Sequence, residues 1–185
     1  MLIPKLDGSQ PIPGLRDLTL LDFWSWAYSD VFSNVNRAVF AEFIVGSLLD
    51  AVQTVRVEWD AVDLIYRGRR IEVKSAAYLQ SWDQQQLSRI SFDIAKKIAW
   101  YADTNTYADE AIRSADCYVF CLYPETDRSR ANILDVTSWQ FFVLSTGYIE
   151  QELGDQKTLS LSRLEGMCSP ADYEDVKSRV DQALR

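Results

Sequence analysis

Residues 60–78 read Asp-Ala-Val-Asp-Leu-Ile-Tyr-Arg-Gly-Arg-Arg-Ile-Glu-Val-Lys-Ser-Ala-Ala-Tyr. Apolar and β-branched residues alternate with polar ones on both sides of Gly68. Glycine takes the positive φ angle of a tight turn at little steric cost. The pattern therefore predicts a β-hairpin with strands at 62–67 and 70–78.

The parity of the hairpin decides which polar side chains meet, because successive side chains of a strand point to opposite faces. Glu72 and Lys74 share a face by their spacing alone. With a two-residue loop, Asp63 lies opposite Glu72 or Lys74 on that same face. A three-residue loop would shift the register by one and send Asp63 to the other face.

An even loop would give the hairpin a metal-binding pair of acids. Opposed residues have Cβ atoms about 4.5–5.5 Å apart, so Asp63 and Glu72 could converge on one cation whose oxygen ligands lie at about 2.1 Å. Mg²⁺ fits this geometry, and Mn²⁺ is the alternative. Lys74 would offset carboxylate repulsion and could orient or deprotonate a water, as metal-dependent phosphodiester hydrolysis requires.

An acid, a turn and an acid-x-Lys triplet on the next strand resemble the signature of the PD-(D/E)xK, or restriction-endonuclease-like, nuclease superfamily. By that resemblance, Asp63, Glu72 and the backbone carbonyl of Val73 would hold Mg²⁺ or Mn²⁺. Lys74 would serve the attacking water, and the products would carry 5′-phosphates.

Further tracts extend the resemblance, and one position departs from it. The sequences of residues 71–82 and 113–120 also resemble those of a bacterial branch of the superfamily. Val62 stands where the family name places a proline. Asp60 is a rival for the first acid, but parity favours Asp63, because Asp60 falls in the expected connection before the hairpin.

Glu42 is the only ionisable residue between positions 38 and 49, in an otherwise apolar stretch. Burying an uncompensated carboxylate is expensive, so this acid must face water, pair or coordinate. The superfamily places a helix with a Glu just before the hairpin, so the resemblance implies that Glu42 is a further metal or water ligand. The alternative is an edge residue of the apolar stripe.

Composition predicts one α/β domain, because 185 residues with 48% hydrophobic content can bury a substantial core. The resemblance implies a restriction-endonuclease-like core of order αβββαβ, a mixed central β-sheet flanked by helices. Before the hairpin we expect an irregular arm over 1–17, helices near 19–28 and 34–50, the second capped by Asn34, and a strand near 51–57.

After the hairpin, residues 91–115 leave two alternatives open. One is a helix over 92–101, which the superfamily fold favours. The other is a short strand followed by an ordered loop that holds Asp103. Beyond them we expect strands at 116–123, 132–136 and 139–145, the last of which could instead start a helix, and a helix over about 170–184 with Ser169 as its cap and Pro170 in first position.

The chain contains no histidine, which excludes imidazole-dependent serine and cysteine mechanisms and the common zinc sites. No glycine-rich phosphate-binding motif is present. The cysteines, Cys117, Cys121 and Cys168, lack metal-ligand spacing. No apolar run is long enough to cross a bilayer and no signal segment opens the chain, so the sequence predicts a cytoplasmic protein without a membrane partner.

The net charge of −8 opposes a nucleic-acid partner unless positive charge is clustered. Arg67, Arg69 and Arg70 at the hairpin tip, with a second pair at 96–97, could follow a phosphate backbone. Gln80 is a further candidate for substrate contact, or a plain loop residue. The charge predicts weak intrinsic affinity for DNA or dependence on a partner subunit. Many superfamily relatives act as dimers because two strands must be cut, so the resemblance also allows a homodimer.

These features predict a magnesium-dependent nuclease that acts on DNA. Two other interpretations remain open. One is a non-catalytic nucleic-acid-binding or protein-binding module that keeps the polar triad as a structural network. The other is an acidic interaction subunit whose aromatic N-terminal helices pack on a partner.

Overall fold

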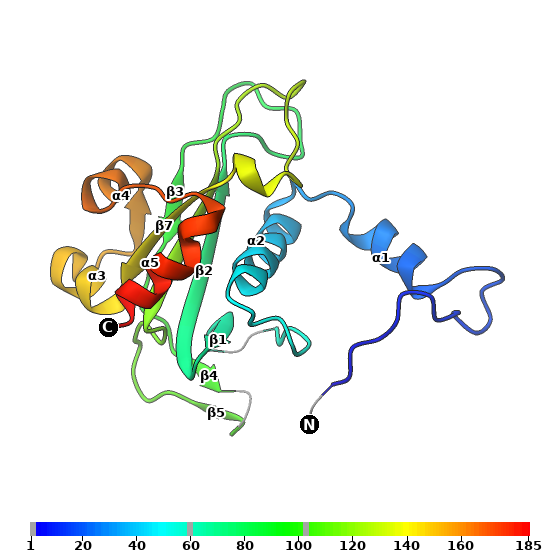
Figure 1. Cartoon of the computed structure of the whole chain (residues 1–185), viewed down its shortest axis with the longest axis horizontal. Coiled ribbons are helices and arrows are strands. Elements are labelled where there is room, and N and C mark those ends of the chain that lie inside the picture. Colours follow the sequence, from blue (N-terminus) through cyan, green and yellow to red (C-terminus); the bar gives the residue numbers. More distant parts are fainter. Residues whose placement is uncertain (1–2, 59–60, 102–103) are drawn as a thin grey trace.

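A mixed four-stranded sheet forms the centre of the chain, for which a computed structural model describes residues 3–58, 61–101 and 104–185 (Figure 1). The strand order is β1-β2-β6-β7. β2 and β6 run parallel, whereas β1 and β7 are antiparallel to their neighbours. The four strands are β1 (Leu64–Tyr66), β2 (Arg69–Ala77), β6 (Cys117–Tyr123) and β7 (Gln140–Ser145).

The hairpin between β1 and β2 turns on two residues, Arg67 and Gly68, whose φ angles are 50° and 75°. Two positive φ angles are typical of the type I′ turn, whose twist matches that of the flanking strands. Leu64 pairs with Ile71, so continuing the register places Asp63 opposite Glu72. The expected even loop is therefore confirmed.

The two faces of the sheet are covered by different elements, and Figure 1 shows α2 on one side of β2 with α3 and α4 on the other. One core joins the sheet to α2 (Asn34–Leu48) and α5 (Val176–Ala183). The opposite core joins it to α3 and α4 and to the small sheet β3-β8. These elements are α3 (Thr146–Leu153), α4 (Leu161–Met167), β3 (Ser91–Asp93) and β8 (Thr158–Ser160).

The N-terminal helix α1 (Leu20–Tyr28) has no buried residue and projects from the body in Figure 1. Thr19 caps it through a reciprocal pair of hydrogen bonds with Asp22. In the part of the chain that the structure describes, no helix combines the length and apolarity needed to cross a bilayer. The remaining elements are β4 (Trp100–Tyr101), β5 (Thr106–Tyr107), η1 (Val136–Ser138) and η2 (Tyr173–Asp175).

Helices near 19–28 and 34–50 are confirmed, although Ser33 rather than Asn34 caps the second. The strand expected at 51–57 is absent, because this segment lines a cavity beside α2 without pairing to the sheet. The αβββαβ order is therefore reproduced only in part, as an α/β fold with a mixed sheet.

The prediction of a helix over 92–101 is wrong. The alternative prediction of a short strand is confirmed at β3. Both backbone polar groups of Ile94 are hydrogen-bonded. Its N–H donates to the Lys157 carbonyl, and its carbonyl accepts from Arg113. These contacts keep the segment extended. Asp103 lies outside the described residues.

Two further expectations are corrected near the C-terminus. Residues 132–136 are not a strand, because the Asp135 side chain accepts from Thr137 N–H and caps the 3₁₀ turn η1. The last helix begins at Val176 rather than at Pro170, because Ala171 pairs with Phe141 at the sheet edge and holds the preceding chain extended. The strands at 116–123 and 139–145 are confirmed within a residue.

Gly46 allows α2 to approach the chain that leads into the hairpin. A Cβ at this position would lie 2.6 Å from Val52 Cγ1 and 3.1 Å from Leu64 Cδ2. We expect Gly46→Ala to lower the free energy of unfolding by about 1 kcal/mol, because overpacking costs about 1–3 kcal/mol and the helix propensity of alanine returns about 1. Urea denaturation measures this change.

The matched control is Gly166→Ala in α4, where an added Cβ meets nothing within 4 Å. This variant is expected to gain up to about 1 kcal/mol from helix propensity alone. Equal stabilisation of both variants would contradict the close approach at Gly46.

Candidate functional site

A cavity of about 450 Å³ brings Asp63, Glu72 and Lys74 together. Glu72 and Lys74 alternate along β2 with Ile71 and Val73, which face the core under α2. Their own side chains point to the opposite face, and Asp63 reaches that face from the chain that precedes β1. The two-residue turn places all three side chains on the same face of the sheet.

Asp63 is held in a crowded, partly buried position. Its Oδ2 accepts a hydrogen bond from Val73 N–H at 2.7 Å. Burial, followed by the charges of Glu72 and Glu42, raises the pKa of Asp63 to about 7, and the Val73 hydrogen bond and Lys74 only partly oppose this shift. Near neutral pH, Asp63 therefore exists in both charge states.

Lys74 forms an ion pair with Glu72, and both side chains are about four-fifths buried, with 21% and 18% exposed. Burial lowers the pKa of Lys74, but the Glu72 charge and hydrogen bond, together with Asp63, outweigh it and raise the pKa above its usual value. The Lys74 amine is thus an ammonium at neutral pH. In this state it is a hydrogen-bond donor rather than a base.

The Val73 backbone faces the same edge of β2 as Asp63. A strand residue directs its N–H and C=O toward the same neighbour in an antiparallel pair, and Val73 N–H donates to Asp63. The Val73 carbonyl therefore points to the same edge of β2 as its N–H, toward Asp63.

Glu42 lies on α2, the helix that covers the other face of the sheet. Its side chain is only 9% exposed and is paired with Arg56, whose Nη2 lies 2.9 Å from Glu42 Oε1 while Nε contacts Oε2. Glu42 and Arg56 line a second cavity of about 390 Å³, which meets the first at Asp63. Arg56 was not predicted from the sequence, because no local pattern pairs it with α2.

The hairpin-tip arginines do not line the cavity of Asp63 and Glu72. Arg67 Nη1 lies 3.2 Å from Asp181 Oδ1. Arg69 and Arg70 both approach Asp116, at 3.4 and 3.8 Å. Their positive charge is thus partly offset by acids that come from distant parts of the sequence.

Gln80 is also placed away from the cavity. It is buried, its Nε2 donates to the Ala77 carbonyl at 2.9 Å, and its Oε1 accepts from Arg37 at 3.3 Å. These contacts hold the chain that follows β2. Asp60, the rival first acid, lies outside the described residues.

A second wall of the cavity was missed by sequence reasoning, and it comes from the segments 93–100 and 107–114. It contributes Asp93, Lys97, Trp100 and Tyr107, together with the buried Arg113. Three acids and three bases thus line the cavity, in a chain whose net charge is −8. The adjacent lysines at 96–97 were the only signal for this wall.

No set of three or more Asp, Glu, Cys or His side chains converges as a metal cage among residues 3–58, 61–101 and 104–185. A magnesium ion does not need such a cage, because it is commonly held by one or two carboxylates with waters and substrate phosphates. Asp63, Glu72 and the Val73 carbonyl are hard oxygen donors, and the mutual repulsion of the acids favours a cation between them. The donor set therefore fits Mg²⁺ or Mn²⁺.

Comparison with known proteins gives one family. Residues 24–163 match the family model described as Bacteriophage T4 endonuclease IV, which is more than half of the chain. The matched span contains α2, the hairpin and both walls of the cavity. No curated protein matches the chain.

Asp63 should give the metal-free protein a distinctive pH dependence. Its pKa rises from an ordinary 3.8 to about 7 on folding, so its contribution to stability is complete at acid pH and is lost as the pH rises to about 7. The loss can reach about 1.4 kcal/mol for each pH unit in that window. Asp63→Asn keeps an acceptor for Val73 N–H and should not show this loss.

Unfolding free energies of both proteins in a chelator, measured between pH 5 and pH 8, test this expectation. The stability of Asp63→Asn relative to the wild type should increase across the range. Parallel profiles for the two proteins would rule out an elevated pKa at Asp63.

Proposed function

This chain belongs to the bacteriophage T4 endonuclease IV family, and we propose that it is a metal-dependent endonuclease that hydrolyses phosphodiester bonds of DNA. The observation that carries the proposal is the convergence of Asp63, Glu72 and Lys74 in one cavity. The acid, two-residue turn and acid-x-Lys arrangement, with β2 parallel to β6, also supports a relation to the PD-(D/E)xK superfamily. The absence of a helix over 92–101 weighs against the full αβββαβ core.

Asp63, Glu72 and the Val73 carbonyl would hold Mg²⁺ or Mn²⁺. When bound, such a cation supplies charge stabilisation to phosphoryl oxygens and lowers the pKa of a coordinated water. Deprotonated Asp63 is needed to hold the cation, and its elevated pKa means that a proton must leave its carboxyl group first.

Lys74 has two tasks in this proposal. Its ammonium holds Glu72 in place through their ion pair. The same Nζ can donate a hydrogen bond to the attacking water or to a non-bridging phosphate oxygen, where negative charge increases in the transition state. Its raised pKa favours this donor role over that of a general base.

Glu42 would act through Asp63 in this arrangement. Its carboxylate is engaged by Arg56, and its charge contributes to the high pKa of Asp63. We therefore assign Glu42 to the tuning of the first acid, with direct ligation of water or metal as an alternative that requires release from Arg56.

One observation favours the second candidate, a non-catalytic binding module. The triad is internally satisfied, because Lys74 pairs with Glu72 and Asp63 accepts from Val73 N–H. A structural network of this kind would need no cation. Metal dependence therefore separates the two functions.

Cleavage assays with Mg²⁺ or Mn²⁺ test the catalytic triad. We expect Lys74→Ala to lower kcat/KM by about 10²–10³-fold, the usual cost of removing one hydrogen-bond donor to transition-state charge, and Asp63→Ala to lower it at least as far. Lys157→Ala, at an exposed lysine that does not line the cavity, is the control and should cleave like the wild type. Retention of full activity by Lys74→Ala would remove lysine 74 from the mechanism.

Cation binding should also be visible without turnover. Near pH 7, Mg²⁺ should raise the Tm of the wild type and release part of a proton from Asp63, because ligation requires the carboxylate. Calorimetric titrations in two buffers of different ionisation enthalpy measure the proton release, which Asp63→Asn should lose. If Mg²⁺ neither stabilises the chain nor supports cleavage of single-stranded DNA, double-stranded DNA or RNA, the binding module is favoured instead.

A further inference from the structure

The wall of the cavity that faces the acids carries two aromatic rings and the exposed cation of Lys97, together with Asp93 and the buried Arg113. Lys97, Trp100 and Tyr107 line the same cavity as Asp63 and Lys74. This wall comes from the segments 93–100 and 107–114, which are distant in sequence from the hairpin. A ligand in this cavity can therefore contact these three side chains as well as the acids.

Trp100 and Tyr107 form a pair on one face of the β4–β5 hairpin. They are directly opposite one another in the antiparallel register, so their Cβ atoms are about 4.5–5.5 Å apart. Trp100 Nε1 donates to Asn105 Oδ1 at 3.2 Å, which ties the edge of the ring. Tyr107 is 71% exposed, so this aromatic surface remains available for stacking.

Lys97 is the member of the lysine pair at 96–97 that faces the cavity. Its backbone forms an antiparallel bridge with Ile112, with both N–H to O distances at 3.0 Å. Its Nζ lies 2.7 Å from Asp93 Oδ2, and its side chain remains 62% exposed. The backbone is thus fixed, while the ammonium can exchange Asp93 for a phosphate oxygen.

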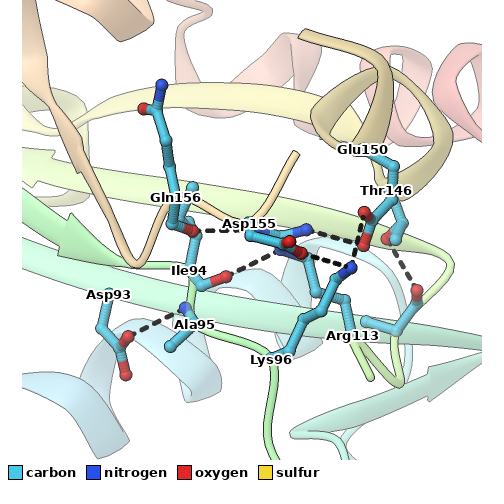
Figure 2. A network of polar contacts seen from close by, with 10 residues as sticks. Asp93, Ile94, Ala95, Lys96, Arg113, Thr146, Glu150, Asp155 and Gln156 are labelled. Atoms are coloured by element: carbon cyan, nitrogen blue, oxygen red, sulfur yellow. Dashed lines mark hydrogen bonds and ion pairs between the residues drawn. The ribbon is translucent and has the colours of Figure 1, made fainter. Parts of the chain in front are cut away.

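A polar network around the buried Arg113 supports the base of the wall, and Figure 2 shows it. Arg113, whose side chain is fully buried, donates to the Ile94 carbonyl at 2.7 Å and to the Gln156 carbonyl at 2.9 Å. Its Nη1 also lies 2.6 Å from Glu150. Lys96 joins the same network through Glu150 and Asp155 (Figure 2).

This bracing has a functional consequence. The network ties the chain just before Lys97 to α3 and to the turn that precedes β8. Binding groups mounted on such a support lose little conformational entropy when a ligand arrives. The wall is therefore preorganised, although its tip is exposed.

We propose that Lys97, Trp100 and Tyr107 form the substrate-binding surface for the nucleotide next to the scissile phosphate. Lys97 binds a backbone phosphate, and the Trp100–Tyr107 pair stacks on a nucleobase. This inference rests on the proposed nuclease function and deepens it. It also assigns substrate binding to this wall rather than to the arginines at the hairpin tip, which do not line the cavity of Asp63 and Lys74.

Binding of a fluorescently labelled DNA oligonucleotide tests the aromatic pair. The full-length chain with Lys74→Ala serves as the parent, so that cleavage does not interfere. Adding Trp100→Ala and Tyr107→Ala together should raise Kd by about tenfold or more, the loss that follows from removing a stacked base. Trp100→Phe keeps a ring and should bind like the parent.

The matched control is Trp26→Ala, which removes an 84% exposed tryptophan from α1, outside the cavity. Its Kd should stay within about twofold of the parent, since surface substitutions away from a binding site have small effects. Thermal unfolding of each variant confirms that the chain is folded before its affinity is compared.

The salt dependence of binding tests Lys97. Loss of one phosphate contact should reduce the slope of log K against log salt concentration by about 0.7–0.9. Lys97→Ala is expected to show this reduction, Lys97→Arg to retain the parental slope, and Lys157→Ala to leave it unchanged. An unchanged slope for Lys97→Ala, with a reduced slope for Lys157→Ala instead, would contradict the assignment.

The outcomes for the wall and for catalysis are separable. The wall assignment is overturned if the parent does not bind DNA, or if the aromatic double variant binds like the parent. Weaker binding on substitution of Arg67, Arg69 and Arg70 would then place the contact at the hairpin tip. If the wall variants weaken binding but the wild type cleaves nothing with Mg²⁺ or Mn²⁺, the wall stands and the nuclease function fails.

Discussion

The two-residue turn at Arg67 and Gly68 is the constraint on which both the core and the site depend. It fixes the register so that alternate residues of β2 go to opposite faces. Ile71 and Val73 then pack beneath α2, while Glu72 and Lys74 reach the cavity beside Asp63. A shift by one residue would bury the charged side chains and expose the apolar ones. The free energy of core packing therefore also enforces the geometry of the polar triad.

The electrostatics of the site follow from this enforced proximity. Acids brought together in a partly buried position repel one another. Burial and this repulsion together raise the pKa of Asp63. The neighbouring acids are matched with cations of their own, Glu72 with Lys74 and Glu42 with Arg56. The result is a cavity lined by equal numbers of acids and bases within a strongly acidic chain. Such a local balance allows an anionic substrate to approach a protein whose overall charge would repel it.

The sequence predicted the parts of the fold that depend on residues close to one another along the chain. Strand alternation predicted that Glu72 and Lys74 share a face, and that an even loop would bring Asp63 opposite one of them. The turn at Arg67 and Gly68 selects Glu72. The second wall depends on contacts across long sequence separations, such as Arg113 with Glu150 and Ile94 with Lys157, and a local pattern contains no signal for them. The helix expected over 92–101 failed for this reason. The arginines at the hairpin tip stood out as a basic cluster, but their acidic partners, Asp116 just before β6 and Asp181 in α5, could not be inferred locally.

The central strand β6 has a practical consequence of its own. All seven of its residues are buried, and two of them are Cys117 and Cys121. Burial raises the pKa of the Cys117 thiol to about 12 and that of Cys121 also upward, so neither forms the reactive thiolate in the native state. Alkylating reagents can reach these sulfur atoms only when the middle of the sheet opens. The rate of their modification therefore measures global opening of the sheet, and it reports on cooperative unfolding without an introduced probe residue.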